Sequence, residues 1–256
     1  MCLSDDLRQD GVAERVIVTG GAQGIGFGVA AALVSGGTRV AVIDVNRDRA
    51  HAAADELGHG ALAYVADLTV EAQATDVIAA AIDGLGGLEG LVNNAGIVSN
   101  GPAEQTSYND FRRVIDVNLC ALFLCARTVG SYFINANIAG SIVNTASMAA
   151  RIVVHPQQQV AYNASKAAAV ALTRTLAAEW ARHGIRVNSV SPGYVRTPLV
   201  ESPDLADLRE GWANLVPLGR LAAVDDVIGA YEFLLSNKAR YVTGHDLIVD
   251  GGYTLW

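Results

Sequence analysis

The sequence predicts an α/β fold, a doubly wound parallel sheet in a single domain, from three observations. Short β-branched runs alternate along the chain with Ala- and Leu-rich stretches of helical spacing, which is typical of βαβ units with right-handed crossovers. The strand-like runs are nearly continuous in apolar residues, as they are in a sheet covered by helices on both faces. No linker or block of charge divides the 256 residues, a length that one α/β domain often fills.

The expected elements alternate in a regular order. Helical spacing of apolar residues is clearest in 26–37, 47–58 and 71–86. The segment from Pro198 to Leu218 has three prolines, several charges and little periodicity, so we expect it to be a mobile flap rather than part of the core. Seven runs have the composition of strands: 15–20, 38–45, 62–68, 89–96, 141–147, 185–193 and 246–252.

Composition favours a small-molecule partner. The net charge is −8 and no Lys/Arg cluster is present, which argues against nucleic acid or an anionic membrane as the main partner. Cys2, Cys120 and Cys125 form no CxxC pair and indicate a reducing compartment. The first residues lack the pattern of a secretory signal, and we expect no apolar run elsewhere to reach the ~20 residues of a membrane span. A cytoplasmic location is predicted.

A glycine-rich loop follows the first expected strand, in VIVTGGAQGIGFGVA. Gly20, Gly24 and Gly26 allow a tight turn and close backbone approach, and an Ala-rich helix then begins with its free N–H groups toward the loop. A pyrophosphate group fits such a position between a strand and a helix. A purely structural turn is the alternative.

Polar residues end the next three strands. Asp44 ends the second, where a carboxylate accepts hydrogen bonds from the adenosine ribose hydroxyls and repels a 2′-phosphate. We therefore expect NAD rather than NADP, although Arg47 weakens this exclusion. Groups at the carboxyl ends of parallel strands converge on one crevice, although each taken singly could be a helix cap or a turn. The third and fourth strands end in Asp67-Leu68 and Asn94-Ala95-Gly96.

Two helical stretches carry unexpected polar residues. Asn118 interrupts an apolar stretch, as either a satisfied core amide or a functional group. Tyr162 and Lys166 lie four residues apart where an Ala-rich helix begins, so they share one helix face. The ammonium then lies near the phenol, or near a group that the phenol touches. Both packing and chemistry fit this pair.

Taken together, these motifs carry a family resemblance. TGGAQGIG, NNAG, Asn118, Ser147, YNASK and SPGYVRTP occur in the order and spacing typical of short-chain dehydrogenase/reductases of about 250 residues, and the resemblance covers essentially the whole chain. It implies a Rossmann fold with a seven-stranded parallel sheet, a nicotinamide cofactor, and a catalytic set of Asn118, Ser147, Tyr162 and Lys166.

The resemblance also implies a role for each catalytic residue. Tyr162 would be the general acid/base, its pKa lowered from about 10 by Lys166 and by the oxidised nicotinamide. Ser147 would hydrogen-bond the reacting oxygen, Lys166 would also hold the nicotinamide ribose, and Asn118 would hold a water that links the lysine to solvent. Val195 and Thr197 would bind the carboxamide, and the 198–218 flap would close over the substrate.

The full cofactor set expected from these motifs spans five strand ends and two catalytic residues. Its members are Gly20, Gln23, Gly24, Ile25, Gly26, Asp44, Asp67, Leu68, Asn94, Ala95, Gly96, Tyr162, Lys166, Pro192, Gly193, Val195 and Thr197.

The loop SMAARIVVHPQQQVAY and the tail VDGGYTLW resemble a subgroup that acts on sugar alcohols. His155, Gln159 and Tyr194 are candidates for contacting such a substrate, although a surface-loop role fits them too. Ala149 and Val154 stand where polyol enzymes often have polar groups, which leaves a less polar secondary alcohol or diol open.

Two other functions compete with an NAD-linked alcohol dehydrogenase. An acyl-carrier-bound 3-oxo reductase would prefer NADPH and a basic docking patch, against which Asp44 and the acidic charge argue. A non-catalytic NAD sensor is disfavoured because all four catalytic positions are filled. Long apolar helices and the tail Tyr253–Trp256 predict a homotetramer; no spacing in the sequence indicates a metal site, although the resemblance allows one at the tail.

Overall fold

The computed structural model describes residues 11–198, 200–201 and 205–256. Within them, seven strands form one sheet in the order β3-β2-β1-β4-β5-β6-β7, and every pairing between neighbours is parallel. The predicted fold class is confirmed. The strands are β1 Arg15–Thr19, β2 Arg39–Asp44, β3 Leu62–Val65, β4 Gly90–Asn93, β5 Ser141–Thr145, β6 Arg186–Pro192 and β7 Asp246–Val249.

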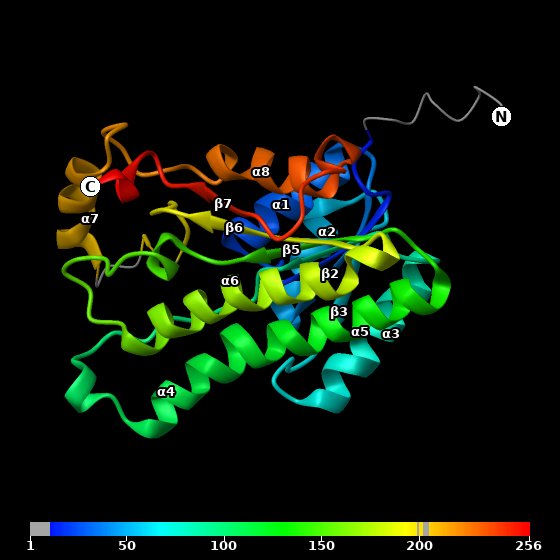
Figure 1. The fold of residues 1–256 in the computed structure, drawn as a ribbon, viewed down its shortest axis with the longest axis horizontal. Helices are drawn as coiled ribbons and strands as arrows, with labels where there is room; N and C mark the ends of the chain where they lie inside the picture. Colours follow the sequence, from blue (N-terminus) through cyan, green and yellow to red (C-terminus); the bar gives the residue numbers. More distant parts are fainter. Residues whose placement is uncertain (1–10, 199, 202–204) are drawn as a thin grey trace.

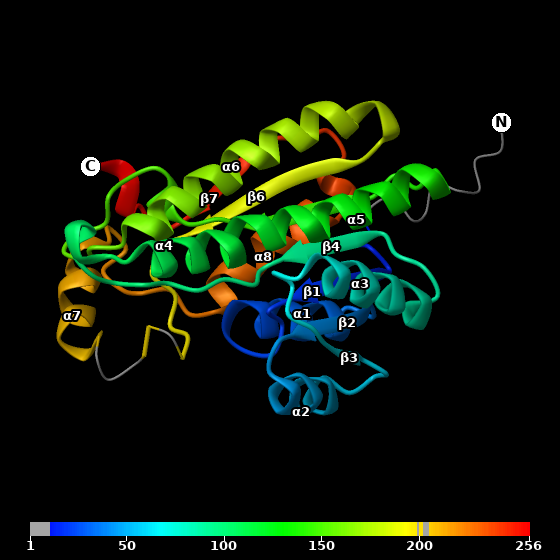
Figure 2. The ribbon, with the colours of Figure 1, turned by 90° about the horizontal axis from the view of Figure 1, so that it is seen from below.

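Helices cover both faces of this sheet. Buried residues of α1 and α8 pack on one face and those of α3, α5 and α6 on the other, an arrangement that Figure 1 shows from the side of the sheet and Figure 2 from below. The helices are α1 Gly24–Ser35, α2 Arg47–Leu57, α3 Glu71–Leu85, α4 Tyr108–Ile115, α5 Ala121–Ala136, α6 Val160–Trp180, α7 Ala206–Leu215 and α8 Asp225–Leu235.

The strands are apolar on both sides because both sides are covered. In β1, Val16 and Val18 join the core under α1 and α8, while Ile17 between them joins the core under α3 and α5. Successive strand residues point to opposite faces, so a strand covered twice must be apolar throughout. The pattern expected from the sequence is confirmed here.

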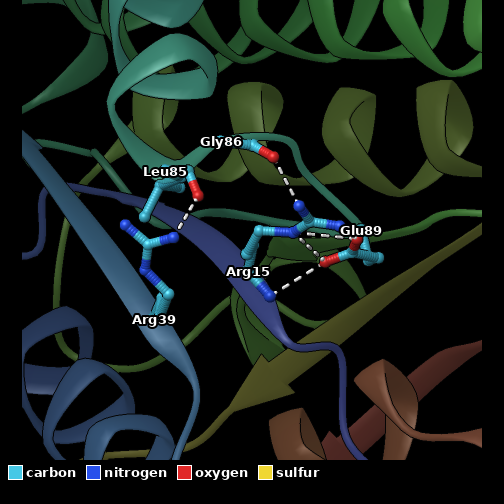
Figure 3. Close-up of polar contacts among 5 residues, drawn as sticks. All are labelled: Arg15, Arg39, Leu85, Gly86 and Glu89. Carbon is cyan, nitrogen blue, oxygen red and sulfur yellow. Dashed lines mark hydrogen bonds and ion pairs between the residues drawn. The ribbon is translucent and has the colours of Figure 1, made fainter.

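Arginine side chains fasten the edge of the sheet where the strands begin. Figure 3 shows Arg15, at the start of β1, against Glu89, which precedes β4. The backbone N–H of Arg15 donates to Glu89 Oε2 at 2.9 Å, and Arg39 Nη1 donates to the carbonyl of Leu85 at 2.6 Å. These contacts lie at the opposite edge of the sheet from the carboxyl ends of the strands.

A π-helical turn, Asp116–Cys120, joins α4 and α5 into one helix from Tyr108 to Ala136. By length and composition this helix is apolar enough to cross a membrane, which corrects the expectation that no apolar run reaches that length. Its most apolar 18-residue window is 44% buried, and Ala126, Val129 and Phe133 pack in the core. Core packing accounts for its apolar face.

The segment 198–218 has more regular structure than its sequence predicts. It contains α7, and Trp212 on that helix is buried and stacks on Tyr194 with ring centroids 4.2 Å apart. The order comes from contacts with distant residues, which local periodicity does not report. Figure 1 shows α7 beside the C-terminal segment. Leu199 and residues 202–204 of the expected flap lie outside the described residues, as does Cys2.

Candidate active site

A cavity of about 1130 Å³ runs along the carboxyl ends of the strands. Such a position, where the chain crosses from β1 to β2 on one side and β4 lies on the other, is where open α/β sheets bind ligands. The cavity is lined by every residue of the expected cofactor set except Gly26, and by Ser147. Residues from six strand ends thus meet around one cavity.

The glycine loop is shaped to let a ligand approach the backbone. Gly20 has φ +59°, and a Cβ there would lie 2.8 Å from Ala95 Cα. Gly26 does not line the cavity because it lies behind the loop, where a Cβ would be 2.3 Å from the Gly20 carbonyl oxygen. α1 begins at Gly24 and Gln23 gives it no side-chain cap. Its first N–H groups therefore suit a pyrophosphate.

Asp44 lines the cavity together with Arg49, a residue that the sequence did not single out. Asp44 Oδ1 accepts from the backbone N–H of Asn46 at 3.0 Å. Arg49, in the first turn of α2, donates from Nη1 to Gln23 Oε1 at 2.8 Å, and both side chains line the cavity. The signal in the sequence was a basic residue five positions after Asp44.

Hydrogen bonds connect the residues after β4 to the end of β1 and the glycine loop. Thr19 Oγ1 accepts from the backbone N–H groups of Asn94 at 3.1 Å and Ala95 at 3.2 Å, and Asn94 Nδ2 donates to the Gly20 carbonyl at 3.0 Å. Two cofactor motifs more than seventy residues apart therefore form one rigid wall.

Asn118 is fully buried on the π-helical turn and does not line the cavity. Its Oδ1 accepts from the Ile97 N–H at 2.8 Å, and its Nδ2 donates to the Ile97 carbonyl at 2.9 Å and to Ser165 Oγ at 3.0 Å. Ser165 in turn donates to the carbonyl of Tyr162 at 2.7 Å. The amide thus connects the loop after β4 to the start of α6. Ser165 lies inside the YNASK motif but was not singled out.

Tyr162, Lys166 and Ser147 meet at the cavity. Tyr162 and Ser147 both line it, and their side chains lie close enough for Ser147 to influence the pKa of the phenol. Lys166 Nζ lies 5.7 Å from the Tyr162 ring centroid and donates to the Thr145 carbonyl at 2.7 Å. A Cβ on Gly96 would lie 3.5 Å from the same Nζ, so this position leaves the ammonium room.

Burial governs the protonation of this pair. Burial raises the pKa of Tyr162, and the hydrogen bond from Ser147 opposes that rise. Burial also lowers the pKa of Lys166 to about 8. In the protein without a cofactor, the pKa of the phenol is therefore raised. The lowered pKa expected from the sequence refers to the site with oxidised nicotinamide bound.

The three substrate candidates do not line the cavity. His155 is exposed, and Gln159 is buried, where its Nε2 donates to Asn163 Oδ1 at 3.0 Å. Tyr194 is buried, stacks on Trp212, and donates to Gln157. The structure thus gives Gln159 and Tyr194 contacts to protein side chains.

The cavity has lining residues on α4 and at the start of the π-helical turn that the sequence did not indicate. They are Asn109, Arg112 and Arg113 on α4, and Asp116 on the turn. Arg112 pairs with Asp116 at 3.5 Å, with both side chains more than one-third exposed. This polar wall could be anticipated only from the packing of α4 against α6. No group of three or more His, Cys, Asp or Glu placed to hold a metal ion is found in residues 11–198, 200–201 and 205–256.

Comparison with known proteins gives consistent matches over the whole chain. A family model described as enoyl-(acyl carrier protein) reductase matches residues 20–254. D-threitol dehydrogenase of Mycolicibacterium smegmatis is 38% identical, over 98% of this chain and 95% of the relative. Galactitol 2-dehydrogenase (L-tagatose-forming) of Cereibacter sphaeroides is 41% identical, over 93% of this chain and 94% of the relative.

The fold is shared with solved structures at similar identity. A short-chain type dehydrogenase/reductase from Mycobacterium marinum superposes with a TM-score of 0.92 at 40% identity, covering 96% of this chain and 98% of that one. Sequence relatives, fold and motif order agree. The chain therefore belongs to the short-chain dehydrogenase/reductase family and is an oxidoreductase that acts on CH–OH groups.

Proposed function

We propose that the chain is an NAD-dependent dehydrogenase that interconverts a secondary alcohol of a sugar alcohol or diol with the corresponding ketone. The observation that carries this proposal is the meeting of Ser147, Tyr162 and Lys166 in the cavity lined by the expected cofactor residues. The two relatives compared above are named for threitol and galactitol, which supports a polyol substrate.

In oxidation, Tyr162 accepts the proton of the substrate hydroxyl as the general base, and in reduction it returns that proton. A bound oxidised nicotinamide would supply the hydride acceptor and, before hydride transfer, a positive charge that favours the phenolate form of Tyr162. Ser147 lines the same cavity beside Tyr162, so an alcohol oxygen that contacts both side chains has its developing charge stabilised. This charge balance opposes the burial that raises the pKa of Tyr162.

Lys166 and Asn118 support this proton transfer in different ways. Lys166 is held at the cavity wall by the Thr145 carbonyl and is placed to hold the nicotinamide ribose. Asn118 fixes the Ile97 loop and, through Ser165, the backbone of Tyr162. We propose that the π-helical turn around Asn118 also holds the water of a proton relay, since such turns are often found at functional sites.

NAD is the proposed cofactor because Asp44 ends β2 at the cavity. A carboxylate accepts hydrogen bonds from two ribose hydroxyls and repels a 2′-phosphate. Arg49 opposes this repulsion, since its guanidinium lies at the same end of the cavity. We therefore expect NAD to be preferred, with measurable use of NADP.

Ala149 and Val154 do not count against a polyol. Both are buried in the apolar cluster that contains Trp212 and Tyr194, and neither lines the cavity. Reduction of a carrier-bound acyl group, which the description of the matching family model suggests, is disfavoured by the net charge of −8, since the carrier is itself acidic.

The proposal extends to assembly and access. Leu255 and Trp256 are adjacent and are 78% and 79% exposed, and contiguous exposed apolar surface often marks an interaction site. We propose a cytoplasmic homotetramer with the tail against a neighbouring subunit, and closure of the 198–218 flap over the substrate.

The test is reduction of NAD, followed by absorbance, against a panel of four- to six-carbon polyols, vicinal diols, simple secondary alcohols and, in reverse, a 3-oxoacyl thioester. Turnover of polyols or diols supports the proposal. Turnover of the thioester with NADPH alone would replace it with the carrier-linked function.

A further inference from the structure

Tyr231 is a buried hydroxyl that no cofactor or catalytic motif includes. It lies on α8, with no exposed surface, and its Oη is 3.0 Å from Thr145 Oγ1 at the end of β5. Thr145 lines the cavity, whereas Tyr231 does not. A hydrogen bond therefore joins a helix behind the sheet to the wall of the active site.

The direction of this hydrogen bond follows from its neighbours. Asn94 Nδ2 donates to the Gly20 carbonyl, which can only accept. The amide orientation is thereby set, and Asn94 Oδ1 accepts from Thr145 Oγ1 at 3.3 Å. Because Thr145 donates its only hydroxyl hydrogen to Asn94, its oxygen is the acceptor in the contact with Tyr231, and Tyr231 is the donor. Burial raises the pKa of Tyr231, so its hydroxyl stays protonated and able to donate.

Thr145 is also the partner of the catalytic lysine. Its backbone carbonyl accepts the 2.7 Å hydrogen bond from Lys166 Nζ. One residue thus contacts the cofactor wall through its side chain and Lys166 through its main chain. A constraint on the position of Thr145 therefore also constrains the Asn94 side chain and the Lys166 ammonium.

We propose that Tyr231 is a positioning residue for the dinucleotide site, acting through Thr145 on Asn94, the glycine loop and Lys166. The inference rests on the proposed function, which assigns Asn94 and Lys166 to cofactor binding. It predicts that loss of one hydroxyl outside the cavity weakens dinucleotide binding.

Ser141 supplies a matched control. It lies on the same strand, and its buried Oγ donates to the Leu234 carbonyl of the same helix at 2.9 Å. Ser141→Ala therefore also removes one buried hydrogen bond between β5 and α8. Ser141 begins β5, at the opposite edge of the sheet from the cavity.

The experiment is fluorescence titration of NADH, with a thermal melt to confirm folding of each variant. Tyr231→Phe should raise the Kd for NADH about three- to tenfold, the range expected from one net hydrogen bond. Ser141→Ala should lower the melting temperature but leave the Kd unchanged. Equal Kd values for wild type, Tyr231→Phe and Ser141→Ala would overturn the proposal.

A second variant tests the route through Thr145. Thr145→Val should weaken NADH binding by itself, and adding Tyr231→Phe to it should weaken binding no further. A full additional loss in the double variant would overturn the proposal. If wild type binds neither NADH nor NADPH, the proposed function and this inference both fail, whereas normal binding with a silent Tyr231→Phe removes the inference alone.

Discussion

The ammonium of Lys166 donates a 2.7 Å hydrogen bond to the backbone carbonyl of Thr145, in a site where Lys166 is 4% exposed. Burial lowers the pKa of this lysine to about 8. Burying the charged form of this lysine therefore lowers the stability of the folded protein.

This cost predicts a pH-dependent stability. The folded pKa of Lys166 lies below the value of 10.5 that an unburied lysine has, so between about pH 8 and pH 10.5 the unfolded chain binds more protons and stability rises with pH. Lys166→Met should raise the free energy of unfolding at pH 7 by roughly 1–3 kcal/mol, and the gain should shrink as the pH rises through that window. Turnover should be lost.

The measurement is urea unfolding of Lys166→Met across this pH range, with Lys238→Met, an exposed residue, as the control. The control should follow wild type. A Lys166→Met protein that is less stable than wild type at pH 7 would show that the lysine contributes more to the fold than its burial costs.

Tyr162→Phe should lower turnover by about 10²–10⁴-fold, the usual contribution of a general acid/base. NADH affinity should stay within about twofold, because the phenol is assigned to proton transfer. Tyr241→Phe, which alters a fully exposed tyrosine, is the control. Steady-state rates and fluorescence titration measure the two effects, and retained turnover in Tyr162→Phe would move the acid/base role to another group.

Asp44→Ala should reduce the preference for NAD over NADP, measured as the ratio of kcat/KM values. With the carboxylate removed, Arg49 is left to attract the 2′-phosphate. Asp44→Ala with Arg49→Ala should then lose the gain in NADP use. Asp48→Ala is the matched control, since Asp48 is an exposed acid in the first turn of α2 that does not line the cavity. If Asp44→Ala leaves the ratio of kcat/KM values as close to wild type as Asp48→Ala does, the assignment of Asp44 is contradicted.

The exposed Leu255 and Trp256 predict a tail-dependent assembly. Light scattering of the wild type should give the mass of a tetramer, and removal of Leu255 and Trp256 should shift it toward smaller species. A monomeric wild type would contradict the proposed assembly.

Sequence patterns predicted the sheet because each strand is apolar on both faces, as Val16, Ile17 and Val18 illustrate. The cofactor residues were predictable because they occupy strand ends, which a parallel sheet brings together whatever the loops do. Gly20 and Asn94, which follow two neighbouring strands, are joined by a hydrogen bond at this edge of the sheet.

The remaining features depend on contacts between distant residues, which no local pattern reports. Tyr194 was a candidate for the substrate, yet its ring stacks on Trp212 and its hydroxyl contacts Gln157. Thr145 belongs to none of the expected sets, and the structure gives it contacts to Asn94, Lys166 and Tyr231.

The most direct test of the central claim is NAD reduction by wild type and Tyr162→Phe against the alcohol panel at neutral and alkaline pH. We predict that wild type oxidises a polyol or diol with NAD faster than with NADP, that the rate rises toward alkaline pH, and that Tyr162→Phe is slower by about 10²–10⁴-fold. Equal activity of the two proteins, or no oxidation of any polyol or diol by wild type with either cofactor, would contradict the account.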